Sequence, residues 1–452
     1  MNVLVLNGSP SGENSITLYT VKYIERQFPD CTFEVLHVGQ RIKSIEKDFS
    51  KAKEAIERAD LLLFCYPVYT FLVPAQLHRF VELIKESGMD LAKKYATQIS
   101  TSKHFYDVTA HRFLQDNCDD LGLRYVRGLS ADMDDLLCER GQKEALSFFR
   151  HVLWSMEHGY AEPRLSRAPV SFVPAQPTEA SVSVPASGDK TVAIVASFDP
   201  KAGGVLQTMI DRFRALLPYQ TRLVNLEEFP FAGGCLGCFH CAADGTCVYR
   251  DGFDRYLREN IQSADAIVYA YTIKDHSMGY RFKLYDDRQF CNGHRTVTMG
   301  KPVGYLVDGP LDEEPNLRML MEARAEVGGN YLSGIATDQA DPDGEVKQLA
   351  DNLVYAVEND YQQPKNFYGV GGLKIFRDLI YQMQGLMRAD HRFYREHGFY
   401  EDFPQKHKGR IAAMYLVGSL MKNKKLQQKI GGKMTEGMVM PYQKVLEKTP
   451  KQ

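Results

Sequence analysis

The sequence predicts an α/β fold with two doubly wound parallel sheets of five strands each, arranged in tandem, followed by a helical C-terminal extension. Short apolar, β-branched stretches alternate with longer helical stretches, which is typical of parallel sheets covered by helices. The order of these elements repeats once along the 452 residues, and a segment rich in proline and serine separates the two copies.

The predicted strands pair off between the two copies. Those of the first copy lie at 2–7, 32–38, 59–69, 97–101 and 124–130, and those of the second at 191–196, 221–227, 264–274, 302–307 and 330–336. The second strands start 189 residues apart (32 and 221), whereas the third strands start 205 residues apart (59 and 264). The second copy therefore carries an insertion between its second and third strands, beyond a strand's carboxyl end, where ligands bind in such sheets.

Composition sets the expected organisation. We predict a first domain over 1–160, a linker over 161–190, a second domain over 191–360 and a helical, basic extension over 361–452. The net charge of −2 gives no reason to expect nucleic acid as a partner, and no stretch is apolar over the roughly 18 residues of a membrane span. The N-terminus lacks a basic region before its apolar run, so we interpret it as a buried strand and expect a cytoplasmic protein with reduced thiols.

The C-terminal extension carries eleven lysines and arginines against four acidic residues over 401–452. We expect its helices to pack on the second domain. The alternatives are a lid over a cofactor, or contact with an anionic partner or a membrane surface.

A loop of small polar residues follows the first strand and leads into a helix, in the stretch "LNGSPSGENSITLYTVKYI". Backbone N–H groups at the helix start, together with Ser9, Ser11, Asn14 and Ser15, would make a neutral cradle for a phosphate. An ordinary capped helix after a turn is the alternative.

This loop and two others resemble those of the flavodoxin-like NAD(P)H-dependent FMN reductases, which carry Gly-Ser-Pro followed by Asn-Ser, and Pro-x-Tyr after the third strand. The resemblance covers residues 1 to about 155. It implies an FMN phosphate at the first loop, an isoalloxazine ring beside the second and closure by a third loop, "STSKHFYD". The residues implied at the ring are Pro67, Val68, Tyr69, Thr70, Ser102, Lys103 and His104.

Four cysteines occupy the insertion of the second copy, "CLGCFHCAADGTC". Zinc sites usually use two pairs with a longer spacer, whereas closely repeated cysteines are typical of iron–sulfur ligands. The loop resembles the compact motif of the iron–sulfur flavoproteins, which implies a [4Fe–4S] cluster on Cys235, Cys238, Cys241 and Cys247. Zinc, free thiols or a disulfide are the alternatives. We interpret the five scattered cysteines as core or incidental, namely Cys31, Cys65, Cys118, Cys138 and Cys291.

The second copy departs from the phosphate loop of the first. Asp199 stands in the matching loop, "ASFDPKAGGVLQTM", where a carboxylate would repel a phosphate. We therefore expect a degenerate flavodoxin-like domain without FMN. Trp154, the one tryptophan of the chain, is expected in the core.

These features predict an FMN-dependent oxidoreductase that passes electrons between FMN in the first domain and the cluster in the second, as a pseudo-dimer within one chain. NAD(P)H is a possible reductant. Expected partners are a small molecule or a redox protein that gives or takes electrons, and a homodimer is possible. One alternative is an NAD(P)H:flavin or quinone reductase without a cluster. Another is a non-catalytic electron carrier or docking protein.

Overall fold

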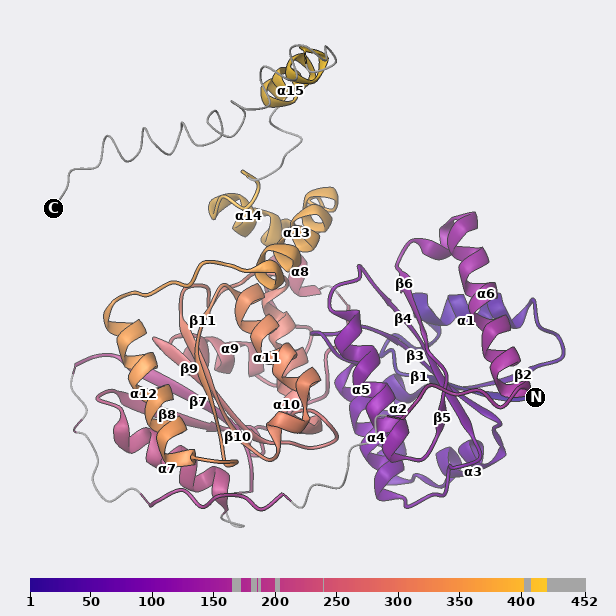
Figure 1. Ribbon diagram of the computed structural model, residues 1–452, viewed down its shortest axis with the longest axis horizontal. Helices are drawn as coiled ribbons and strands as arrows, with labels where there is room; N and C mark the ends of the chain where they lie inside the picture. The colour runs from indigo at the N-terminus through magenta and orange to yellow at the C-terminus, as the bar shows by residue number, and fades with distance from the viewer. Residues whose placement is uncertain are drawn as a thin grey trace. The chain divides into compact units, whose positions relative to one another are not determined.

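The computed structural model describes residues 1–164, 172–179, 185, 188–199, 204–238, 240–401 and 408–420. The chain forms two compact units, Met1–Phe393 and Tyr394–Gln452. The first unit contains two parallel sheets with helices on their faces (Figure 1), which confirms the predicted fold class. We call the first sheet with its helices the first domain and the second sheet with its helices the second domain.

The first sheet has the strand order β2-β1-β3-β4-β5, all parallel, which is the order of the flavodoxin fold. The predicted fifth strand is split into two pieces, β5 and β6, which both pair with β4. Gly128 lies at the break, where a Cβ would stand 2.3 Å from the Gln98 side chain. The strands are β1 Asn2–Asn7, β2 Thr32–Leu36, β3 Leu61–Pro67, β4 Tyr95–Ser102, β5 Arg124–Tyr125 and β6 Leu129–Asp132.

Helices cover both faces of the first sheet because its strands are apolar on both sides. One face carries α1 Ile16–Glu25 and α6 Glu139–Glu157. The other carries α2 Val38–Lys47, α3 Ser50–Arg58, α4 Ala75–Glu86 and α5 Asp107–Asp120. The expectation that Trp154 is a core residue was wrong: on α6 it is 48% exposed and stacks on the His158 ring.

The second sheet repeats the same order as β11-β10-β9-β7-β8. Its strands are β7 Thr191–Ser197, β8 Gln220–Asn225, β9 Ala266–Thr272, β10 Pro302–Asp308 and β11 Tyr331–Thr337. One face carries α7 Val205–Leu216 and α12 Pro342–Glu358. The other carries α9 Phe253–Leu257, α10 Gly279–Arg288 and α11 Pro315–Gly328. The short α8, His240–Asp244, lies in the cysteine loop.

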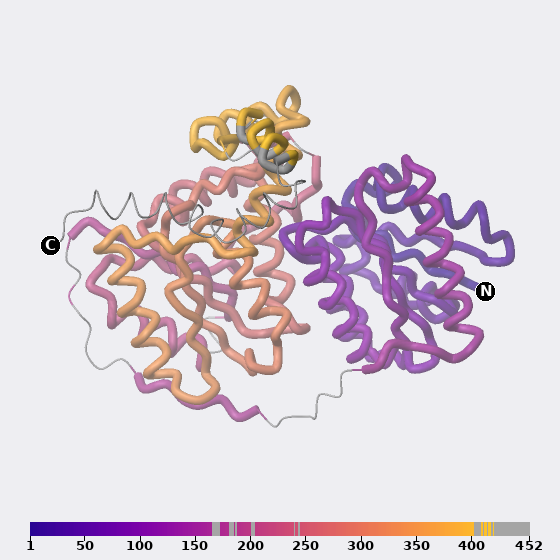
Figure 2. The backbone as a smooth tube through the Cα atoms, turned by 45° about the horizontal axis from the view of Figure 1, so that its top comes forward, coloured from indigo at the N-terminus to yellow at the C-terminus, as the bar shows by residue number. Residues whose placement is uncertain are grey.

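The two domains meet through equivalent helices. α4 packs against α10 and α5 against α11, and one apolar core runs without a break from the first sheet across these helices to the second sheet. Within the predicted linker, residues 172–179 run along the second domain (Figure 2). The amide of Ala175 donates to the Asp338 carbonyl at 2.7 Å, and that of Thr178 to the Asp343 carboxylate at 2.9 Å.

Beyond the second sheet the described part of the C-terminal region is helical, with α13 Phe367–Gln382, α14 Arg388–Glu396 and, in the second compact unit, α15 Lys408–Leu420. α13 packs against α11, as expected for an extension that lies on the second domain. Residues 421–452, which hold most of the predicted basic excess, lie outside the described residues. Among the helices that the structure describes, none is long and apolar enough to cross a membrane.

Candidate functional site

A cavity of about 530 Å³ joins the two domains. Such a volume is in the range of cofactor sites, about 300–1,000 Å³. Residues from all three predicted FMN loops and from the cysteine loop line it, namely Ser9, Ser11, Asn14, Ser15, Pro67, Val68, Tyr69, Thr70, Ser102, Lys103, Cys235, Cys238, Cys241 and Cys247. Of the site residues that we predicted, His104 alone is not part of the lining.

The first loop is held in shape by its own polar groups. Ser15 caps α1, with its Oγ accepting from the Leu18 amide at 3.4 Å, and Ser9 Oγ accepts from the Ser11 amide at 3.3 Å. Ser9 and Ser15 are buried. The loop therefore presents hydroxyls and the N–H groups of a helix start to the cavity, and these groups fit a phosphate.

One acidic residue lies in this loop. Glu13 is exposed, and its carboxylate accepts from Lys22 Nζ at 2.6 Å and lies 2.8 Å from His37 Nε2. Hydrogen bonds from Lys22 and then His37 lower the pKa of Glu13. The negative charge of the loop is therefore offset locally and directed away from the serines.

The second loop turns sharply at the end of β3. The backbone amides of Tyr69 and Leu72 each donate to the other's carbonyl, at 2.8 and 3.0 Å, and the two residues between them, Thr70 and Phe71, have φ of 39° and 69°. Left-handed backbone at residues with side chains persists only where the surroundings hold it. The turn places Tyr69 against Gly237 of the second domain. The contact leaves no room for a side chain, since a Cβ at position 237 would stand 1.9 Å from Tyr69 Oη.

The third loop follows β4. Lys103 lines the cavity, but its Nζ donates to Asp132 at 2.8 Å and to Asp134 at 2.6 Å. Burial alone would lower the pKa of Lys103, and the two carboxylates outweigh this and raise it. His104 is directed elsewhere, since its Nδ1 lies 2.9 Å from the Asp107 carboxylate. The structure thus brings Lys103 to the site as a paired cation.

The cysteine loop supplies four thiols to the same cavity. All nine cysteines belong to the described residues and none forms a disulfide there. Burial raises the pKa of Cys235 and raises that of Cys241 to about 11, so both thiols stay protonated until a metal displaces the proton. Four soft sulfur donors on one loop fit an iron–sulfur cluster, and also zinc, by ligand type.

Arg288, at the end of α10, holds the base of the cysteine loop. Its guanidinium donates to both Asp251 oxygens at 2.8 Å and to the Gly233 carbonyl at 2.9 Å, and its centre lies 4.5 Å from the Tyr249 ring. Burial would raise the pKa of Asp251, but Arg288 outweighs it and lowers that pKa to about 2. Both partners are buried, so this pair fixes the loop from within.

Sequence reasoning missed several residues of the site. Phe290 and Cys291 line the cavity just after α10, and the Cys241 thiol donates to the Phe290 carbonyl at 2.8 Å. Phe105 and, from α13, Phe376 also line it and pack against each other with ring centroids 4.2 Å apart. α13 therefore contributes to the wall of the cavity. No motif marks these residues, which are brought together by packing alone.

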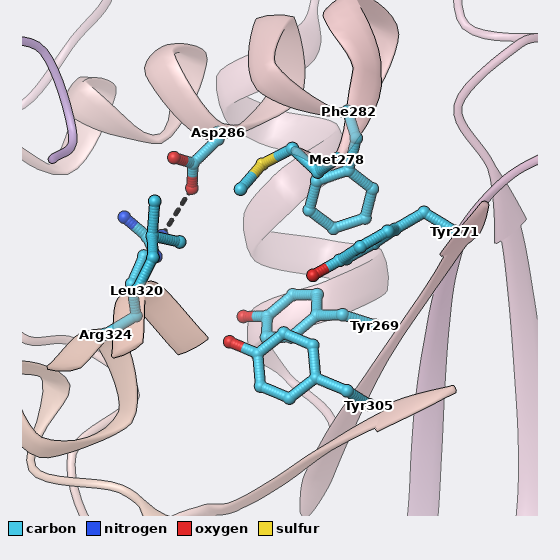
Figure 3. Close-up of a pocket in the computed structure, with 8 residues that line it drawn as sticks. All are labelled: Tyr269, Tyr271, Met278, Phe282, Asp286, Tyr305, Leu320 and Arg324. Carbon is cyan, nitrogen blue, oxygen red and sulfur yellow. Dashed lines mark ion pairs between the residues drawn. The ribbon is translucent and has the colours of Figure 1, made fainter. Parts of the chain in front are cut away.

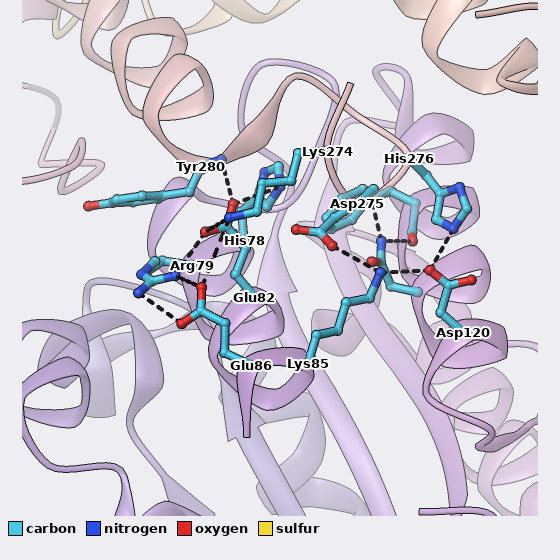
Figure 4. A network of polar contacts seen from close by, with 12 residues as sticks. His78, Arg79, Glu82, Lys85, Glu86, Asp120, Lys274, Asp275, His276 and Tyr280 are labelled. Carbon is cyan, nitrogen blue, oxygen red and sulfur yellow. Dashed lines mark hydrogen bonds and ion pairs between the residues drawn. The ribbon is translucent and has the colours of Figure 1, made fainter. Parts of the chain in front are cut away.

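A second polar cluster joins the domains away from the cavity (Figure 4). His78, Glu82 and Asp275 bring candidate metal ligands within 4.8 Å of one another. Cations already hold both carboxylates, however: Arg79 and Lys274 contact Glu82 at 2.9 and 3.1 Å, and Lys85 contacts Asp275 at 3.0 Å. A metal ion would have to displace these groups, so we interpret the cluster as an ion-pair network that joins the domains.

A smaller cavity of about 10 Å³ lies inside the second domain (Figure 3), enough for about one water molecule. Arg324 and Asp286 form an ion pair in its wall, with 2.5 Å between Nη2 and Oδ1. Its other lining residues are Tyr269, Tyr271, Met278, Phe282, Tyr305 and Leu320. Arg324, Tyr269 and Tyr305 also line the large cavity, so a polar wall lies on the second-domain side of the site.

Part of the chain is similar in sequence to known proteins. Residues 1–123 match the family model of the NADPH-dependent FMN reductases. The iron-sulfur flavoprotein of Archaeoglobus fulgidus is 28% identical over 174 residues, which cover 36% of this chain and 79% of that protein.

Several solved structures are also similar. The NAD(P)H:quinone oxidoreductase of Methanothermobacter marburgensis is 17% identical and covers 36% of this chain and 99% of its own, with a TM-score of 0.29. An NADH:FMN oxidoreductase is 19% identical and covers 37% of this chain and 93% of its own, also at 0.29. The FMN-dependent NADH-azoreductase of Bacillus anthracis is 13% identical and covers 35% and 99%, at 0.25.

The predicted resemblance is thereby confirmed, with the family model falling on the first domain and a distant iron–sulfur flavoprotein as a relative. The first domain is that of a flavin-dependent oxidoreductase of the FMN reductase type. When bound, FMN would supply the transfer of a hydride or of single electrons, and the chain would supply the phosphate cradle, the ring loop and a cavity between the two domains.

Proposed function

We propose that the protein is an FMN-dependent oxidoreductase in which electrons pass between FMN on the first domain and a [4Fe–4S] cluster on Cys235, Cys238, Cys241 and Cys247 of the second. The observation that carries this proposal is the shared cavity, lined both by the FMN loops and by the four cysteines. The two sets lie in different copies of one fold, so neither copy alone has both. Transfer between them would then need no second chain.

Contacts between the two loops support this proposal. Tyr69 Oη lies against Gly237, between the first two cysteines, and Gln76 Nε2 donates to the Cys235 carbonyl at 3.2 Å. The Phe290 ring packs edge-on against Tyr69 at 5.9 Å. These contacts bring the ring loop and the cysteine loop side by side within one chain. The expected electron donors or acceptors are NAD(P)H, a small molecule or a redox protein, in a reducing compartment such as the cytoplasm.

Anaerobic purification with analysis of iron, sulfide and FMN tests the proposal. We expect about four irons per chain, the content of a cluster on four thiolates. Cys241→Ser should lose the iron and keep the FMN, because the phosphate and ring loops belong to the other domain. The matched control is Cys138→Ser, which removes an exposed thiol of the first domain and should change neither cofactor.

Two results would contradict the proposal. Stoichiometric zinc without iron would exclude the cluster, and full iron in Cys241→Ser would exclude this ligand. Stopped-flow reduction then tests the transfer itself, since exchange between two groups in one chain must have a rate independent of protein concentration. Steady-state oxidation of NAD(P)H with a quinone or free FMN separates an enzyme from an electron carrier.

A further inference from the structure

Equivalent turns of the two domains lie at a constant offset in the sequence, and each turn faces the other domain. The turn at Tyr69–Leu72 corresponds to a turn 205 residues later, at Lys274–Ser277, with the same pair of hydrogen bonds at 2.9 and 3.0 Å. Its central residues, Asp275 and His276, also have positive φ, 53° and 61°. Each domain therefore presents the same left-handed turn to the other domain.

After each turn, a carboxylate from the opposite domain accepts a hydrogen bond from the start of the next helix. Asp287 on α10 accepts from the Ala75 amide, at the start of α4, at 2.7 Å. Glu82 on α4, 205 positions before Asp287, accepts from the Tyr280 amide, near the start of α10, at 2.8 Å. In both cases a negative charge lies at the positive end of a helix, which stabilises the helix start. The two carboxylates are structural twins.

The two carboxylates differ in the residue that lies four positions earlier on the same helix. On α10 this is Lys283, whose Nζ forms a buried ion pair with Asp287 and donates to the Tyr69 carbonyl at 2.9 Å and to Thr70 Oγ1 at 2.7 Å. On α4 it is His78, whose ring nitrogens have no hydrogen-bond partner within the described part of the chain. Burial lowers the pKa of His78 to about 3, so this position carries no charge.

All three Nζ hydrogens of Lys283 are therefore donated to groups in or beside the Tyr69–Thr70 turn. Asp287, Thr70 Oγ1 and the Tyr69 carbonyl together fix the turn at the end of β3, and Asp287 also accepts from Thr70 Oγ1. Lys283 and Asp287 are fully buried. A buried pair whose donors and acceptors are all used holds its surroundings in one geometry. Within the described residues, the twin turn has no such fully buried lysine–carboxylate pair: it is held by Lys85, which contacts Asp275 at 3.0 Å and is partly exposed, and by Asn117, which donates to the Asp275 carbonyl at 3.1 Å.

We propose that Lys283 and Asp287 of the second domain are positioning residues for FMN, which hold the Tyr69–Thr70 turn in the conformation that receives the flavin ring. This inference rests on the proposed function, because it assumes that the first domain binds FMN. It assigns the second domain a role in the flavin site that is separate from its cysteines. The pair acts through the turn and does not itself need to touch the flavin.

The test replaces the pair by apolar residues of similar shape, Lys283→Met with Asp287→Leu, because removing both charges together avoids leaving one buried alone. We expect FMN binding to weaken by about 10- to 100-fold, the loss that corresponds to charge-assisted hydrogen bonds. The absorbance maximum and the midpoint potential of bound FMN should also shift. Lys283→Arg, which keeps the charge, should restore binding in part.

The twin network supplies the control. Glu82→Gln removes the equivalent carboxylate charge on the other side of the interface, on α4 and in contact with the Tyr280 amide rather than with the Tyr69–Thr70 turn. It should lower the melting temperature and leave FMN affinity and the flavin spectrum unchanged. A double variant that binds FMN like the wild type, with the same spectrum and potential, would overturn the inference alone. Wild-type protein that binds no FMN would overturn the proposed function and the inference with it.

Discussion

The two domains share one strand order and differ in what their loops present. In the first, buried serines and a capped helix start face the cavity. In the second, the matching loop contains Asp199, and an inserted loop between β8 and β9 brings four cysteines to the site of its neighbour. The comparison teaches that the two copies of a duplicated fold can contribute different loops to one cavity. The first copy supplies the predicted FMN loops and the second supplies the cysteine loop, while the helices that join the copies stay equivalent.

The largest expected effect comes from giving the first loop the charge of the second. Ser15→Asp keeps a good N-cap for α1, so the free energy of unfolding should stay within about 0.5 kcal/mol of the wild type. A carboxylate at the phosphate position repels the dianion, so FMN retention should be lost. The measurement is the FMN released per chain on denaturation.

Ser15→Thr is the matched control, because it keeps both the cap and the hydroxyl. It should bind FMN nearly as well as the wild type. Full FMN occupancy in the aspartate variant would mean that the phosphate lies elsewhere, and the distinction between the two loops would then fail.

The second prediction concerns the cysteine loop, the insertion that distinguishes the second domain from the first. Arg288→Met leaves Asp251 buried without its partner, which should cost about 3–5 kcal/mol of stability. Urea unfolding checks this, with Arg250→Met as a control on the same loop, where an exposed side chain should cost less than about 0.5 kcal/mol. Equal stability of the two variants would show that Arg288 does not hold the cysteine loop.

The strands, and the position of the loops after β1 and β3 at the cavity, could be predicted from sequence because apolar runs and small polar turns are local signals. The 205-residue offset even carries over to the contacts of Glu82 and Asp287. Arg288 could not be predicted, since its partner Asp251 lies 37 positions away along the chain and only the fold brings them together. Likewise, nothing in the sequence shows that His104 bonds Asp107 and not the cavity, because one loop conformation decides it.

Trp154 shows the limit of reasoning from residue type. A large apolar side chain on a helix is usually buried, yet this one lies on the outer surface of α6 between two histidine rings. Cys291, expected to be core or incidental, is a buried core residue that also lines the cavity. The roles of the cysteines and serines as ligands stay predictions, because geometry alone does not show what they bind.

The smallest effect concerns the turn of the second domain, where His276 stands at the position of Phe71. Its Nε2 lies 2.9 Å from Asp120 of the first domain and its Nδ1 2.8 Å from Glu314. Burial would lower the pKa of His276, and these two carboxylates outweigh it and raise the pKa to about 9. Lys85 also faces this group, since it contacts Asp120 at 2.7 Å.

A folded-state pKa above the ordinary 6.5 means that the charged imidazole stabilises the fold fully below pH 6.5, and that this contribution is lost as pH rises through about 9. A difference of this size corresponds to about 3 kcal/mol. The free energy of unfolding of the wild type minus that of His276→Asn, which tolerates the left-handed backbone, should therefore fall by about this amount between pH 6 and 10. Asp120→Asn should show part of the fall, since Glu314 remains. A difference that does not change with pH would mean that His276 is uncharged in the fold, and the two turns would then differ in shape but not in electrostatics.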